Sequence, residues 1–164
     1  MHSSRVALPI NYVVTVVTLA SLFCSLSQNA LTQQAKPNLT GSWKLNLSNG
    51  KVAPHHMPDL YRIKHSDSRL EMVQTVEGRS ESFFYVVDGK DRVTNMSGQV
   101  RAKAYWDGDT VVIEKHLVID AGVRIWTSRY RLSEDGKSLV VAIHTKDSSF
   151  NDIFDESLTY EKQQ

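Results

Sequence analysis

The chain has 164 residues, with 19 basic and 18 acidic side chains and a formal net charge of +1. This balance, with no run of Lys or Arg, argues against nucleic acid or an anionic membrane surface as the main partner. Because the chain has a single cysteine, it cannot form an internal disulfide or a cysteine-rich metal site.

The first thirty residues are typical of an export signal. Arg5 is their only charged side chain, and the apolar run Val13–Phe23 has the length of a signal-peptide core. It is shorter than the roughly 20 residues that a membrane span needs. Small residues follow, as a cleavage site requires. We therefore predict a signal peptide over residues 1–30, cleaved near residues 27–30, and an exported protein that is periplasmic or secreted and has no membrane span after cleavage.

Two alternatives to cleavage remain open. Cys24 ends the apolar run, as in a lipoprotein signal, although Phe23 stands where that signal needs a small residue. The segment could also stay uncleaved as an N-terminal anchor. After the leader, residues 31–38 are predicted to form a linker and residues 39–164 one domain, because about 130 residues suffice for one domain but not for two. Without Arg5 the basic residues fall from 19 to 18 and equal the 18 acidic ones.

Residue pairs that favour turns recur at short intervals along the domain, among them the Asp-Gly pairs at 88–89, 107–108 and 135–136. Asp-Gly is favoured in two-residue hairpin turns because both residues tolerate positive φ. Between the turns lie runs of strand character that often alternate apolar and polar residues, as a strand with one packed face does. The predicted strands are 41–47, 59–65, 69–76, 80–87, 100–106, 110–119, 123–132, 138–145 and 153–161.

This order of strands predicts an antiparallel meander. No stretch has sustained helical periodicity, and no connection is long enough for a crossover helix. A sheet of about 8–10 strands removes its edges and buries its apolar face by closing on itself. The predicted fold is therefore an all-β, up-and-down barrel in which the last strand meets the first, with a two-sheet sandwich as the alternative.

Several motifs resemble those of known barrels. The first strand carries Gly41-Ser42-Trp43, which resembles the Gly-x-Trp start of the calycins, meaning lipocalins and fatty-acid-binding proteins. The motifs after it resemble, in order, those of small secreted lipocalin-like domains of bacteria. They are a Pro-containing loop at 53–58, "YVVDGK" at 85–90, "AYWDGDTVVIE" at 104–114, "LSEDGKSL" at 132–139 and "YEK" at 160–162.

The resemblance implies structural roles for particular residues. Gly41 would permit the tight start of the first strand, and Trp43 would close one end of the barrel. In lipocalins a late Arg lies over this Trp, a role that Arg129 or Arg131 could take. Leu158 stands where fatty-acid-binding proteins carry an Arg that grips a carboxylate, so the resemblance does not extend to that site.

The sequence offers little support for catalysis. The adjacent His55 and His56 lack the spacing of a metal site with any other His or carboxylate, so no metal and no cofactor is predicted. Turn aspartates such as Asp107 and Asp109 usually bond their own backbone. No nucleophile-elbow motif occurs either, and the chain is not expected to be an enzyme.

Side chains on predicted strands could instead line an interior pocket for a small apolar or amphipathic ligand. Small residues such as Ala102 and Ala104 would leave room inside. Non-catalytic binding of such a ligand is the function that the sequence favours. The alternative is a filled barrel that serves as a structural or protein-interaction domain of the cell envelope; ligand identity and oligomeric state stay open. The candidate binding residues are Phe84, Trp106, Trp126, Ser128, Tyr130 and Tyr160.

Overall fold

A computed structural model describes residues 35–47, 57–94, 100–120, 122–147 and 150–164. The chain separates into two units, residues 1–35 and 36–164, and every strand found lies in the second. The predicted signal peptide, with Cys24 and the cleavage region, lies outside the described residues, as do residues 31–34 of the predicted linker and the pair His55-His56. Within the described ranges, no helix has the length and hydropathy needed to cross a bilayer.

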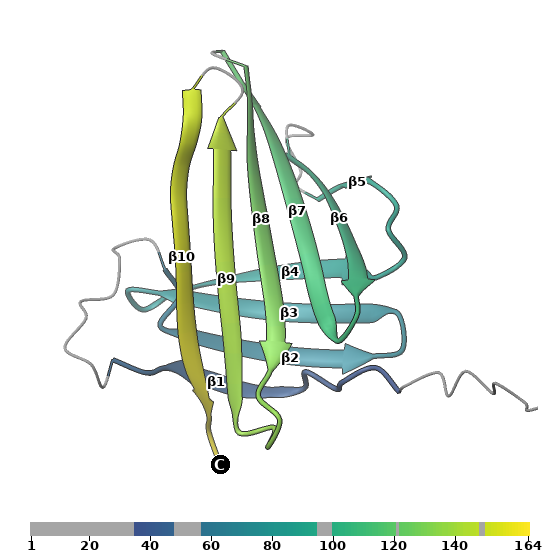
Figure 1. The fold of residues 1–164 in the computed structure, drawn as a ribbon, viewed down its shortest axis with the longest axis vertical. Helices are drawn as coiled ribbons and strands as arrows, with labels where there is room; N and C mark the ends of the chain where they lie inside the picture. Colours follow the sequence, from purple (N-terminus) through teal and green to yellow (C-terminus); the bar gives the residue numbers. More distant parts are fainter. Residues whose placement is uncertain (1–34, 48–56, 95–99, 121, 148–149) are drawn as a thin grey trace, which may run out of the picture. The chain divides into compact units, whose positions relative to one another are not determined.

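The second unit is built from antiparallel strands (Figure 1). Their order follows the chain: β1 (Gly41–Leu45), β2 (Leu60–Ser66), β3 (Arg69–Val76), β4 (Arg79–Val86), β5 (Arg92–Val93), β6 (Val100–Asp107), β7 (Thr110–Ile119), β8 (Gly122–Leu132), β9 (Ser138–Asp147) and β10 (Phe150–Lys162).

These strands form one ten-stranded sheet in the order β4-β3-β2-β1-β10-β9-β8-β7-β6-β5. The sheet curls into a half-barrel, in which β1–β4 run across the view of Figure 1 while β7–β10 run along it. The all-β meander is confirmed, and so is the pairing of the last strand with the first, where Trp43 stands opposite Lys162. Most connections between paired strands are only a few residues long, which is why these neighbours pair antiparallel; the longer one, residues 46–59, joins β1 to β2.

The curled sheet stays open along one seam, between β4 and β6. Among the described residues, a bridge from Val87 to Ala104 and a hydrogen bond from Gly89 N to Ala104 O (2.8 Å) join the two sides. The predicted hairpin at Tyr85–Lys90 is therefore wrong: its turn leads into the short strand β5, which pairs with β6 instead of β4. β5 itself was not predicted, because two residues are too few for a periodic pattern.

On some strands the inward-facing side chains divide into a buried group and a group that borders a cavity. On β9 the inner residues Leu139 and Val141 are fully buried, while Ile143 and Thr145 border a cavity. The same division recurs on β7, where Val111 and Ile113 are buried and the next inner residues border the cavity. We call the buried group the packed end; its members with under 2% exposure include Leu39, Trp43, Leu70, Val111, Ile113, Leu139 and Val141.

Trp43 is the largest side chain of the packed end, and Gly41 makes room for it. The indole N–H donates to Leu39 O at 3.0 Å, and the ring folds back over Gly41. A Cβ added at residue 41 would stand 3.1 Å from that ring, closer than ordinary van der Waals contact. The Gly-x-Trp motif is thus a steric pair, in which the missing side chain at Gly41 lets the indole lie flat against the backbone.

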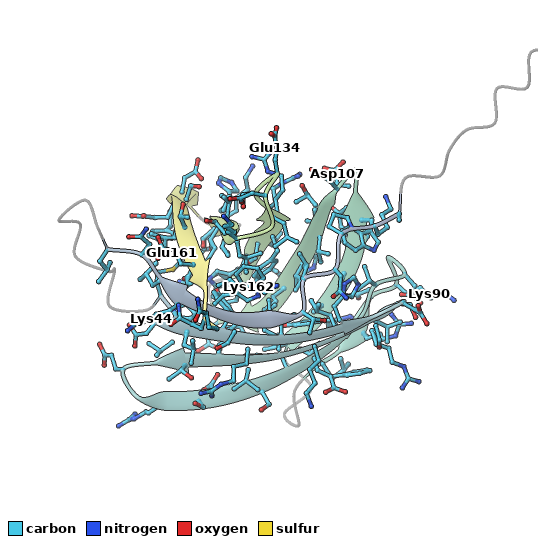
Figure 2. All side chains as sticks on the ribbon, turned by 90° about the horizontal axis from the view of Figure 1, so that it is seen from below. Lys44, Lys90, Asp107, Glu134, Glu161 and Lys162 are labelled. Atoms are coloured by element: carbon cyan, nitrogen blue, oxygen red, sulfur yellow. The ribbon has the colours of Figure 1, made fainter. Side chains whose placement is uncertain are left out.

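The cation above Trp43 differs from the expected arginines. Lys162 Nζ lies 5.3 Å from the ring centroid, at the end of β10 and beside β1 in Figure 2. Arg129 points outward and pairs with Asp107 at 2.8 Å, and Arg131 is exposed. Lys162 can reach the ring because the pairing of β1 with β10 places it opposite Trp43. Both arginines lie in the outward phase of β8, which carries them away from the interior.

Candidate functional site

The interior of the half-barrel holds a cavity of about 810 Å³. Side chains from both halves of the sheet border it, so the curl of the sheet creates the space. Its lining residues are Met57, Pro58, Tyr61, Gln74, Glu81, Phe83, Thr94, Val100, Lys115, Leu117, Arg124, Trp126, Ser128, Tyr130, Ile143, Thr145 and Phe154. Most of this surface is apolar or aromatic, with a few polar groups between, as in sites for small organic molecules.

A cluster of tyrosines separates the cavity from the packed end. The Tyr61 ring meets the Tyr160 ring edge-on at 4.8 Å and the Tyr130 ring at 5.9 Å. The Tyr160 hydroxyl donates to Pro58 O at 3.0 Å. Burial raises the pKa of Tyr61 well above its usual range, and the neighbouring Tyr130 and Tyr160 raise it further. These phenols therefore stay protonated at neutral pH and act as hydrogen-bonding groups at the floor of the cavity.

The walls of the cavity are mainly large apolar side chains. Phe83 contributes from β4, Trp126 from β8, Ile143 from β9 and Phe154 from β10. Ser128 adds a hydroxyl on the same face of β8 as Trp126, because residues two apart in a strand point to the same side. This combination offers a large contact area for an apolar molecule and few groups that would fix its orientation.

Lys115 brings an ammonium group into this apolar surrounding. It lies in the inward phase of β7, with Nζ 4.1 Å from the centroid of the Phe83 ring and 5.8 Å from that of Tyr85. Burial lowers the pKa of Lys115 to about 8, and the attraction of Glu81 offsets only part of that effect. The aromatic faces favour the charged form, since a cation is attracted to the ring quadrupole.

A second cation at the cavity has a carboxylate beside it. Arg124 stands opposite Asp147 in the pairing of β8 with β9, and its guanidinium lies 3.4 Å from the Asp147 carboxylate. The Asp147 side chain is only 2% exposed, whereas that of Arg124 is 40% exposed. Arg124 also lies 5.9 Å over the Trp126 ring. The pair therefore balances its own charge at the edge of the cavity.

The structure brings together three of the six predicted ligand-binding residues. Trp126, Ser128 and Tyr130 border the cavity from alternate positions of β8. Tyr160 is fully buried behind this surface, in contact with Tyr61. The inner face of β8 could be predicted because Trp126, Ser128 and Tyr130 alternate with the more polar Thr127, Arg129 and Arg131.

The other two predicted residues lie elsewhere. Phe84 points outward and is 50% exposed, so its predicted inward position is wrong. β4 carries aromatic residues on both faces, and Phe83 and Tyr85 take the inner one. Trp106 lies against the packed end, 5.6 Å from the His65 ring and beneath Lys36 Nζ at 5.5 Å, and does not border the cavity.

Other candidate groups stay apart from the cavity. Asp107 is exposed and pairs with Arg129 at the surface, and His116 lies 3.9 Å from Glu114 on the outer face of β7. Among the residues that the structure describes, no three His, Cys, Asp or Glu side chains come close enough to hold a metal ion.

Comparison of the sequence with models of known protein families and with curated proteins found no match. The curled sheet is compatible with a barrel fold, and membership of a lipocalin-like family stays a prediction from the motifs.

Proposed function

We propose that this chain is an exported, lipocalin-like barrel that binds one small apolar or amphipathic ligand in its interior and catalyses no reaction. The observation that carries the proposal is the cavity of about 810 Å³ with aromatic and aliphatic walls. Sites for small ligands commonly have volumes of about 300–1,000 Å³ and a few polar groups on a mainly apolar surface. The alternative of a filled barrel requires side chains in this space, and the cavity weighs against it.

The surroundings of the polar groups support binding over catalysis. Nucleophilic mechanisms commonly need a nucleophile within hydrogen-bond reach of a base, and general acid–base mechanisms need a proton donor or acceptor that can reach the substrate. In the described interior, Lys115 contacts aromatic rings, and Arg124 is paired with Asp147. These arrangements suit the recognition of a ligand better than the transfer of a proton.

The cavity can be tested with N-phenyl-1-naphthylamine, an uncharged fluorophore that brightens in apolar surroundings. We expect saturable enhancement and quenching of tryptophan fluorescence by the bound probe. Trp126→Phe should weaken probe binding, because Trp126 borders the cavity, whereas Trp106→Phe should leave the affinity largely unchanged. Equal affinities in both variants would place the probe outside the cavity.

A narrowing variant provides a second readout. Ile143→Trp extends an inner side chain of β9 into the space, and we expect it to weaken probe binding about tenfold or more. Val140→Trp adds a slightly larger volume to the outer face of the same strand and should bind as the wild type does. Wild-type protein that takes up no probe, or Ile143→Trp protein that binds as tightly as wild type, would contradict the proposal.

Export is tested separately, by the mass of the protein recovered from its own host. A mature chain that begins just after residues 27–30 would support the predicted signal peptide. A chain of full length, or one that carries a lipid on Cys24, would replace that part of the proposal. Native mass spectrometry of the same sample would also detect a small molecule that co-purifies.

A further inference from the structure

Lys115 is exceptional among the inner residues of its strand. The neighbouring inward positions of β7 are Ile113 and Leu117, both apolar, and the side chain of Lys115 reaches the aromatic rings of β4 across the interior. A lysine on the outer face would keep its ammonium in water at no cost. Its inward position therefore places a charge where desolvation is unfavourable.

No bonded partner compensates this charge within the described residues. Its Nζ lies over the rings of Phe83 and Tyr85, which offer no hydrogen-bond acceptor of a charged kind. Glu81 attracts Lys115 from further along β4, but desolvation outweighs that attraction. Arg124 differs, because Asp147 lies 3.4 Å from its guanidinium. Because Arg124 already has a carboxylate beside it, Lys115 is the cation of these two that can pair with an anionic group of a ligand in the cavity.

A second polar group beside Lys115 also lacks a partner. The Tyr85 hydroxyl is buried and makes no hydrogen bond to any described residue. Buried hydroxyls almost always have a hydrogen-bond partner, so an unpaired one calls for an explanation. Lys115 borders the cavity without an acceptor for its ammonium, while Tyr85 borders a smaller hollow beside it. Both groups show that this part of the interior is short of acceptor oxygens, and an entering ligand can supply one to Lys115.

We propose that the cavity takes an amphipathic anion, whose singly charged head group pairs with the Lys115 ammonium while its apolar tail lies against Trp126, Ile143 and Phe154. This inference rests on the proposed binding function and adds the charge of the ligand and its orientation. An anion in contact with Lys115 forms a charge-assisted hydrogen bond in surroundings that hold little water. A neutral ligand would leave the ammonium uncompensated, and a cationic one would be repelled.

Three ligands with the same tail test the inference: dodecanoate, dodecanol and dodecylammonium, each titrated to displace N-phenyl-1-naphthylamine at pH 7. We expect dodecanoate to displace the probe at a concentration about tenfold or more below that of dodecanol, with dodecylammonium the weakest. Lys115→Met, which keeps the length of the side chain, should reduce the affinity for dodecanoate to that for dodecanol and leave dodecanol unchanged.

Two further variants separate charge from shape. Lys115→Arg keeps a cation and should retain the preference for dodecanoate. Lys64→Met removes a lysine from the exposed outer face of β2 and should behave as the wild type does. A loss of preference in Lys64→Met would point to the general field of the protein rather than to one cavity group.

The pH dependence gives a readout that a structural role of Lys115 would not produce. Since the pKa of Lys115 in the free protein is about 8, binding of an anion above that pH must take up a proton. The affinity for dodecanoate should therefore fall by up to about tenfold per pH unit above pH 8, while that for dodecanol stays level. The other charged or titratable groups that face this region are Tyr61, Glu81, Tyr85, Arg124, Tyr130 and Asp147. If the fall in the affinity for dodecanoate above pH 8 arises from Lys115, the affinity of Lys115→Met should not fall over the same pH range.

The outcomes distinguish this inference from the function on which it rests. Equal affinity of the wild type for dodecanoate and dodecanol, or a preference that survives in Lys115→Met, would overturn the anion proposal and leave apolar binding intact. If the probe and all three ligands fail to bind the folded wild type, the proposed function itself fails.

Discussion

The inner faces of the strands are filled at one end, the packed end, and border a cavity at the other. On β9, Val141 is fully buried in the packed end, whereas Ile143, two residues further on the same face, borders the cavity. Both are β-branched and apolar, so residue type does not explain the contrast. The difference lies in the space that each side chain faces: Trp43 and Leu39 belong to the buried core at one end, and at the other end the interior holds the cavity.

This contrast has energetic consequences. A side chain at the packed end contacts neighbours on all sides, so its removal leaves a void that the structure cannot close. A side chain at the cavity already has empty space on one side and loses fewer contacts. The packed end should therefore supply the stability of the barrel, and the cavity end should tolerate the variation that ligand binding requires.

The largest expected effect comes from truncating one tryptophan at each end. Trp43→Ala should lower the free energy of unfolding by about 3–5 kcal/mol, the usual cost of removing a buried aromatic side chain. Trp126→Ala should cost about 1 kcal/mol, because the indole is partly exposed and faces the cavity. Urea denaturation followed by far-ultraviolet circular dichroism measures both. Similar losses would mean that the two ends contribute equally to stability.

Enlarging a side chain probes the same contrast in the opposite direction. Val141→Phe adds volume where none is free and should destabilise the protein by about 1–3 kcal/mol or more. Ile143→Phe points the added atoms into the cavity and should change the stability by less than about 1 kcal/mol. The midpoints of urea denaturation of the two variants give the comparison, and a greater loss for Ile143→Phe would show that the cavity is not free to accept side chains.

Lys115 should make the stability depend on pH. Its pKa of about 8 in the folded protein lies below the usual 10.5 of a lysine, so protonation favours the unfolded chain. This cost is complete below pH 8 and disappears as the pH rises towards 10.5. At pH 7, Lys115→Met should therefore be more stable than the wild type by about 1–2 kcal/mol, a value reduced for partial solvent access.

The measurement is urea denaturation of both proteins between pH 7 and pH 10. The advantage of the variant should stay level up to about pH 8 and shrink above it, because there the unfolded wild type binds a proton that the folded protein lacks. Groups common to both proteins, such as the tyrosines, cancel in the difference. A constant advantage across the interval would indicate a packing effect of methionine instead of a titration of Lys115.

Most of the fold could be predicted because its signals are local. Alternation marks the strands, and the Asp-Gly pairs at 107–108 and 135–136 stand between paired neighbours, with glycine at positive φ in both. The third pair, at 88–89, also turns the chain, but the seam at β4 depends on how far the sheet curls. That curvature is set by contacts distant in sequence, which no local pattern records.

The cavity could be predicted only in part, for the same reason. The phase of β8 placed Trp126, Ser128 and Tyr130 correctly, whereas β4, apolar on both faces, did not reveal whether Phe83 or Phe84 points inward. Ala102 and Ala104 were expected to leave room inside, but they border a smaller hollow of about 100 Å³ beside the open seam.

Lys115 was missed although the sequence contains a signal for it. Val111, Ile113 and Leu117 define the inner phase of β7, and the residue that completes this phase is a lysine. A charged residue in an apolar phase is a local observation. The neighbours of Lys115 could not be predicted from the sequence in this way. Its contacts with Phe83 and Tyr85 join strands that are more than twenty residues apart in the chain, and the curl of the sheet brings these strands together.

The smallest effect extends the comparison from side-chain volume to single hydroxyls. Tyr160→Phe removes a donor that bonds Pro58 O in the buried interior and leaves that carbonyl unpaired, which should cost about 1–1.5 kcal/mol in unfolding free energy. Tyr105→Phe removes a hydroxyl that bonds Glu114 at 2.7 Å on the outer face, where water can replace it, and should cost less than about 0.5 kcal/mol. Both variants lose the same atom, so their difference in urea denaturation isolates the effect of burial. If the two costs were equal, water would have to reach Pro58 O as easily as it reaches the outer face, and the floor of the cavity would be wet rather than sealed by the tyrosine cluster.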